Sequence, residues 1–118
     1  MDIYHIWFNL KDSHKDAEFC DVLDRYMTFL RAKKMIEGYR LTRRKLGFGP
    51  QSLGEFHVAI EVLDLGQLDR AFQMAATRAA PIEGPHSDVY SRVKDVTFAL
   101  YRDFPDPVRK KKPARRRR

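Results

Sequence analysis

The stretch "IYHIWFNL", residues 3–10, has the composition of a β-strand whose two faces serve different purposes. Alternate side chains of a strand point to opposite faces of its sheet. One face is apolar and consists of Tyr4, Ile6, Phe8 and Leu10. The other face consists of Ile3, His5, Trp7 and Asn9. The first face predicts a strand of the core, and the second raises the question of what covers a histidine, a tryptophan and an asparagine.

Helical patterns follow this strand. Residues 11–36 have apolar side chains at the spacing of an amphipathic helix, and Ser13 with Asp16 resembles a capping box at its start. Residues 66–80 predict a second amphipathic helix, which we expect to end at the prolines and glycine that follow. Residues 86–93 predict a single helical turn.

Three further strands complete the pattern. Residues 39–48 and 55–65 predict a hairpin, and residues 93–104 predict the last strand. The order β-α-β-β-α-β predicts an α+β, ferredoxin-like domain, with a four-stranded antiparallel sheet and two helices on one face. The face toward the helices is expected to hold Tyr4, Ile6, Phe8, Phe56, Val58, Ile60, Val96, Phe98 and Leu100. The open face is expected to hold His5, Trp7, Asn9, Arg40, Thr42, Arg44, His57, Ala59, Glu61, Thr97 and Tyr101.

The basic charge of the chain is concentrated at its end. The formal net charge is +7, but residues 109–118 hold eight of the 23 Lys and Arg, which leaves 15 basic against 16 acidic side chains in the body. We therefore expect a near-neutral domain over residues 1–107 and a disordered basic tail over residues 108–118. One cysteine, Cys20, excludes an intramolecular disulfide framework, and no segment has the pattern of a signal peptide or a membrane span. These features favour the cytoplasm.

RNA binding is one known use of an open ferredoxin-like face. RRM domains stack bases on aromatic side chains of this face, and the pair Asn9 and Leu10 is common in their first strand. That alignment places Ile6 at a stacking position, while His57 and Ala59 occupy the stacking positions of the third strand. Most of the required aromatic surface is therefore missing, and the RRM-like sheet is kept as the alternative.

The chain resembles the dimeric α/β-barrel superfamily in element order, in the opening "IYHIWFNLK" and in the closing "DVTFALYRDF". Members include stress-responsive barrel proteins, EthD-like proteins and the monooxygenases of antibiotic biosynthesis and haem degradation. The resemblance covers residues 2–104. It implies a homodimer whose sheets pack face to face, with a cleft in each subunit between the sheet and its helices or loops. In the monooxygenase branch Asn, Trp and His surround the substrate, and Asn9 matches the position of the family's Asn.

The candidate site residues lie on the open face. We expect a small-molecule cleft in which His5 or His57 accepts a proton while Asn9 and Tyr101 polarise a substrate oxygen. The expected substrate-binding side chains are Trp7, Arg40 and Glu61. If the cleft is catalytic, the expected chemistry is a cofactor-independent oxygenation or an isomerisation of an aromatic or carbonyl compound. A nonenzymatic binding module remains open.

Two His and one carboxylate are also the ligand set of some iron and zinc sites, and His5, His57 and Glu61 share the open face. Hydrogen bonds across the sheet explain the histidines more simply. We therefore expect neither a metal nor a cofactor. The basic tail is the other candidate for nucleic-acid contact, and its charges are Arg109, Lys110, Lys111, Lys112, Arg115, Arg116, Arg117 and Arg118.

Overall fold

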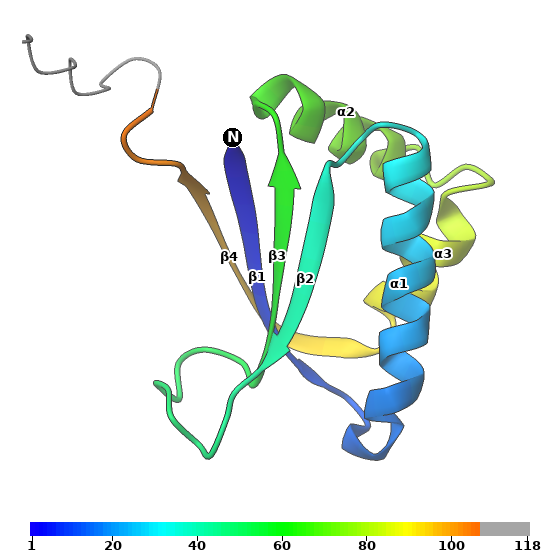
Figure 1. Cartoon of the computed structure of the whole chain (residues 1–118). Coiled ribbons are helices and arrows are strands. Elements are labelled where there is room, and N and C mark those ends of the chain that lie inside the picture. Colours follow the sequence, from blue (N-terminus) through cyan, green and yellow to red (C-terminus); the bar gives the residue numbers. More distant parts are fainter. Residues whose placement is uncertain (107–118) are drawn as a thin grey trace, which may run out of the picture.

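The computed structural model describes residues 1–106 and confirms the ferredoxin-like α+β fold. A four-stranded antiparallel sheet lies on one side, and all three helices cover the same face of it (Figure 1). The predicted tail, residues 108–118, lies outside the described residues. The elements are β1 (Asp2–Leu10), a 3-10 turn (Ser13–Lys15), α1 (Asp16–Ala32), β2 (Gly38–Arg43), β3 (Phe56–Val62), α2 (Leu65–Ala76), α3 (Glu83–Tyr90) and β4 (Val93–Arg102).

The strand order is β2-β3-β1-β4, so the stretch that opens the sequence occupies an interior strand. Trp7 pairs with His57 on β3 and with Thr97 on β4, and His5 pairs with Ala59 and Ala99. This register places the predicted polar and aromatic residues of three strands side by side on the face that carries no helix (Figure 1). The open face predicted from the alternation is therefore confirmed within the strands, but the prediction is wrong for Arg44, which follows the end of β2 and directs its guanidinium to the β2–β3 loop.

The helices differ from the prediction in detail. The predicted capping box is wrong, because the chain first makes a 3-10 turn whose cap is Asp12, which accepts a hydrogen bond from His14 N at 3.0 Å. The predicted single turn near residue 86 is instead an eight-residue helix that begins at Glu83. Gly84 and Pro85 do not prevent it, because proline is tolerated in the first turn, where its missing N–H has no intrahelical partner.

The core lies between the sheet and the helices. Its centre includes Phe19 of α1, Val62 of β3 and Ile82, which are all but inaccessible to solvent. Each such side chain contributes roughly 1.5–3 kcal/mol through burial of its apolar surface. Phe8 stacks on Phe56 across the β1–β3 pair, at 5.8 Å between ring centroids. The alternating apolar positions of β1 and β3 thus form the covered face, as predicted.

The predicted burial of the last strand is wrong for two residues. Phe98 and Leu100 point to the helix side, yet they remain 55% and 47% exposed. β4 is an edge strand, and the helices cover the middle of the sheet without reaching over this edge. The period-2 alternation is also interrupted, since the β1–β4 register shifts between Trp7 and Asn9. Asp95 at the shift has φ 55°, which is typical of a β-bulge.

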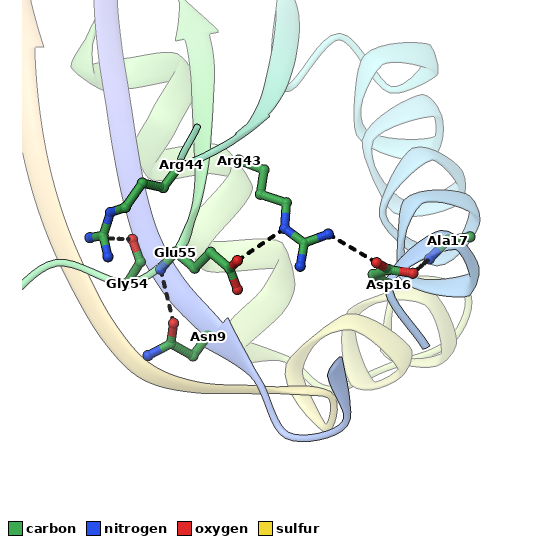
Figure 2. A network of polar contacts seen from close by, with 7 residues as sticks. All are labelled: Asn9, Asp16, Ala17, Arg43, Arg44, Gly54 and Glu55. Carbon is green, nitrogen blue, oxygen red and sulfur yellow. Dashed lines mark hydrogen bonds and ion pairs between the residues drawn. The ribbon is translucent and has the colours of Figure 1, made fainter. Parts of the chain in front are cut away.

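Polar contacts join the lower end of the sheet to α1 (Figure 2). The Arg43 guanidinium lies 3.1 Å from Glu55 Oε1 and 3.0 Å from Asp16 Oδ2 at the start of α1. The Arg44 guanidinium donates to the carbonyls of Pro50 and Leu53, both at 2.7 Å, so it holds the β2–β3 loop in place. These arginines are structural, and neither presents its charge to the open face.

Candidate functional site

Four aromatic rings meet on the open face, and we call His5, Trp7, His57 and Tyr101 the aromatic cluster. The His5 ring stacks on His57 at 5.1 Å and meets the edge of Tyr101 at 5.0 Å, both between ring centroids. Trp7 lies 5.6 Å from the His5 ring and 4.8 Å from the His57 ring. The prediction that His5 and His57 approach each other is confirmed by a hydrogen bond of 2.8 Å between His5 Nδ1 and His57 Nε2.

Burial and charge both act on His57. Its pKa is lowered, first because burial disfavours the imidazolium and second because His5 lies beside it. Its other nitrogen, Nδ1, lies 3.3 Å from the Thr42 hydroxyl of β2. His57 is therefore favoured in its neutral form, and its ring is held by His5 at one nitrogen and by Thr42 at the other.

Apart from Tyr101, the remaining open-face candidates do not converge on the histidine pair. Asn9 is occupied by the protein itself, since its Oδ1 accepts from Glu55 N at 2.9 Å and its Nδ2 donates to Asp95 at 3.1 Å (Figure 2). Arg40 and Glu61 are exposed, and Tyr101 is 61% exposed. Within residues 1–106 no three His, Cys, Asp or Glu side chains are arranged to hold a metal ion. The catalytic and substrate-binding roles assigned to these residues stay predictions.

An apolar cleft lies on the opposite face, between the sheet and the helices. Its volume is about 300 Å³. The strands contribute Tyr4, Ile6, Val58, Ile60, Val96 and Phe98, and the helices contribute Leu23, Tyr26, Met27, Leu30, Leu68, Ala71, Phe72, Ala75, His86, Val89 and Tyr90. Because Phe72 and Phe98 are half exposed, they mark its rim. No residue of the aromatic cluster lines this cleft.

The cleft has few polar groups, and three of them lie near one another. The His86 ring of α3 lies 5.7 Å from the Tyr26 ring of α1 and 5.5 Å from the Tyr90 ring, between centroids. His86 Nδ1 is 3.9 Å from Glu83 Oε2, one turn earlier in the same helix. Both atoms are buried, and neither has a hydrogen-bond partner among the described residues. Buried polar atoms are nearly always satisfied, so this pair indicates a place where a ligand or water binds.

The Tyr26 phenol is held in its neutral form. Burial raises its pKa to about 12, and the nearby Glu83 carboxylate adds to the effect. A neutral phenol donates a hydrogen bond at physiological pH. The walls of the cleft therefore offer a histidine with a carboxylate behind it and a phenolic donor, which are the groups that proton-transfer chemistry requires.

Tyr26, Glu83 and His86 are not among the site residues predicted from the sequence. His86 lies in a segment where only one helical turn was expected, so its relation to Glu83 was not apparent. The available signal was the i, i+3 spacing of Glu83 and His86, which places both on one face of a helix. The contact with Tyr26 depends on the packing of α3 against α1, which no local pattern contains.

Several solved structures share this fold. The described chain is similar to the Arabidopsis thaliana protein At3g17210, with a TM-score of 0.68 and 6% identity over 90% of this chain and 98% of that chain. It is also similar to a candidate antibiotic biosynthesis monooxygenase from Deinococcus radiodurans, with a TM-score of 0.57 and 17% identity over 90% of this chain and 95% of that one. A dimeric ferredoxin-like protein of unknown function from Jannaschia has a TM-score of 0.55 and 9% identity, over 87% of this chain and 100% of that one. At these identities the likeness establishes the fold and no activity.

The fold and its neighbours define a ferredoxin-like protein, and two of those neighbours are described as dimeric. The chain belongs to the family of unknown function DUF6614, whose profile matches residues 1–115. A comparison with curated proteins finds no match. Among the described residues, no helix combines the length and apolar character needed to cross a bilayer.

Proposed function

We propose that the protein binds a small, largely apolar molecule in the cleft between its sheet and its helices. The observation that carries this proposal is that His86 lines a largely apolar cavity, while its Nδ1 and the neighbouring Glu83 Oε2 are buried without a hydrogen-bond partner among the described residues. Ligand sites are typically apolar pockets with a few convergent polar groups. A volume of 300 Å³ corresponds to on the order of ten non-hydrogen atoms, if each takes about the 30 Å³ of a water molecule.

The polar groups favour a proton-transfer reaction, such as the isomerisation of a carbonyl compound. His86 would remove a proton from the carbon beside the carbonyl, and its electron pair would pass to the oxygen to form an enolate. The Tyr26 phenol would donate a hydrogen bond to that oxygen, and Glu83 would stabilise the imidazolium. In a β,γ-unsaturated carbonyl compound the proton then returns to the γ carbon and the double bond moves into conjugation, so no cofactor is consumed. The same carbanion is the species that O₂, as a co-substrate, would attack in a cofactor-independent oxygenation.

Self-association of the open face is part of the proposal. Trp7 and the stacked histidines form an aromatic surface, and aromatic side chains are enriched at protein interfaces. Two of the structural neighbours are described as dimeric, which supports a homodimer in which two sheets face each other. We place this dimer in the cytoplasm, because the single cysteine, Cys20, is an exposed free thiol.

The test is a titration of isotope-labelled protein with 2-naphthol, followed by amide chemical shifts. Binding in the cleft should shift amides of α1, α2 and α3, and Ala75→Phe should abolish the shifts by filling the cleft. Ala17→Phe is the matched control, since Ala17 is exposed on α1 and does not line the cleft. His57→Ala distinguishes the two faces: binding lost in this variant but retained in Ala75→Phe would move the site to the aromatic cluster and overturn the proposal.

A further inference from the structure

A second cavity lies against the first, on the outer side of α3. It has a volume of about 530 Å³ and is bounded by α2, α3 and the segment between them. We call it the outer groove. Four side chains line both cavities, namely Phe72, Ala75, His86 and Tyr90. The His86 ring therefore belongs to a wall that the apolar cleft and the outer groove share.

The two cavities differ in chemistry. Apart from its tyrosines and His86, the cleft is lined by apolar side chains. The outer groove adds Arg78, Glu83, Ser87 and Ser91. Arg78 is the basic side chain of this lining, whereas the Glu83 carboxylate lies against His86. A molecule that lies across the four shared side chains, with one end in each cavity, would thus meet apolar groups at one end and polar groups at the other.

The backbone at Arg78 is held in an uncommon conformation. Its φ is 51°, in the left-handed region that non-glycine residues rarely adopt. Arg78 N donates to Ala75 O at 3.2 Å, and the neighbouring Thr77 hydroxyl donates to Met74 O at 2.7 Å. The hydrogen bonds that end α2 therefore fix the backbone position from which the Arg78 side chain extends, and this residue lines the groove. Because the backbone at position 78 is already ordered, the arginine loses less conformational entropy when it binds a ligand.

We propose that the ligand is an amphipathic carboxylic acid whose carboxylate binds Arg78 in the outer groove while its apolar body occupies the cleft. This inference rests on the proposed function of the cleft. A guanidinium matches a carboxylate with two parallel hydrogen bonds, and the Ser87 hydroxyl adds a donor in the same groove. One arginine balances the single charge of a carboxylate, whereas a phosphate would require more positive charge than this lining holds. The reactive part of the ligand would then lie between the two ends, beside His86.

The experiment compares two probes with the same skeleton, 4-phenylbutanoate and 4-phenylbutan-1-ol, by amide chemical shifts in the full chain. Wild type should bind the carboxylate at least about tenfold more tightly, because hydrogen bonds to charged groups are worth roughly 1.5–3 kcal/mol. Arg78→Gln should reduce this preference to near unity, and Arg78→Lys should retain part of it. Arg70→Gln is the control, since it removes the same charge from α2 without touching either cavity.

Each outcome is decisive. Equal binding of both probes by wild type, or a carboxylate preference that survives Arg78→Gln, would overturn this inference and leave the cleft proposal intact. Binding of neither probe would overturn the proposed function itself. Glycine readily adopts the positive φ of position 78, so Arg78→Gly removes the guanidinium without backbone strain. This variant replaces Arg78→Gln in the experiment if the glutamine variant is unstable.

Discussion

His5 Nδ1 and His57 Nε2 are joined by a hydrogen bond of 2.8 Å between neighbouring strands, and this bond needs at least one neutral ring. If both rings were protonated, both nitrogens would be donors and the bond could not form. The lowered pKa of His57 agrees with this requirement. The aromatic cluster is therefore the part of the sheet whose packing depends on protonation.

The stability of the protein should consequently fall on acidification. The unfolded chain binds a proton at His57 near pH 6.5, whereas the folded chain binds it only at a lower pH, so the unfolded state holds more protons between these values. The stabilisation is complete above about pH 6.5. It is lost as the pH falls through the folded pKa. Urea unfolding between pH 8 and pH 5 should show a larger loss for wild type than for His57→Gln; equal losses would contradict the shift.

Trp7→Glu should prevent self-association. It places a charge at the centre of the proposed interface, where loss of an aromatic anchor costs at least about 2 kcal/mol, or about thirtyfold in the dissociation constant. Sedimentation velocity at micromolar concentration should show a dimer for wild type and for Trp7→Phe, and a monomer for Trp7→Glu. A monomeric wild type would remove the face-to-face arrangement.

Asn9→Asp should destabilise the fold by about 0.5–1.5 kcal/mol, because it sets a carboxylate against Asp95 and removes the amide donor of this exposed hydrogen bond. The double variant Asn9→Asp with Asp95→Asn exchanges the two groups and should recover most of the loss. Denaturation midpoints would measure both effects. If Asn9→Asp kept full stability but abolished turnover, the catalytic role predicted for Asn9 would be favoured over the structural one.

Gly54→Ala should be more damaging than its size suggests. A Cβ at position 54 would lie 2.3 Å from the Phe8 carbonyl carbon, so the β2–β3 loop could not pack against β1 without moving. We expect a loss of at least about 1–3 kcal/mol. Gly84→Ala in α3 is the matched control, since nothing lies within 4 Å of its Cβ. Calorimetric melting of both variants would show whether the contact constrains the loop.

Deletion of residues 109–118 should abolish any affinity for nucleic acid. The remaining chain has a formal charge of −1, because 15 basic and 16 acidic side chains remain. Binding by the full chain should fall steeply with salt and show little sequence preference. Filter binding with two unrelated RNA sequences would measure both. A truncated chain that still selects one sequence would favour the RRM-like alternative.

The parts of this structure that follow from local patterns could be predicted from sequence. The alternation in β1 and β3 predicts both faces of the sheet, and the His5–His57 contact follows from their register. The exposure of Phe98 could not be predicted, because it depends on how far the helices extend over β4. The site at His86 was missed for a similar reason, since Tyr26 meets His86 only after α1 and α3 have packed together, and the i, i+3 contact with Glu83 requires a helix that was expected to begin later.

The bulge at Asp95 divides β4 into two halves, and one extra residue offsets the side-chain alternation of one half from that of the other. Val93 pairs with the buried Leu10, and after the shift Phe98 pairs with Ile6, so both halves direct apolar side chains to the helices. Without the bulge, a regular strand of this length would direct the apolar side chains of one half to the open face, because side chains alternate with a period of two and Val93 and Phe98 are an odd number of residues apart. Deletion of Asp95 would therefore give an unbroken ladder in which both halves still face the helices, whereas straightening the bulge with every residue retained would reverse which face of one half is wet.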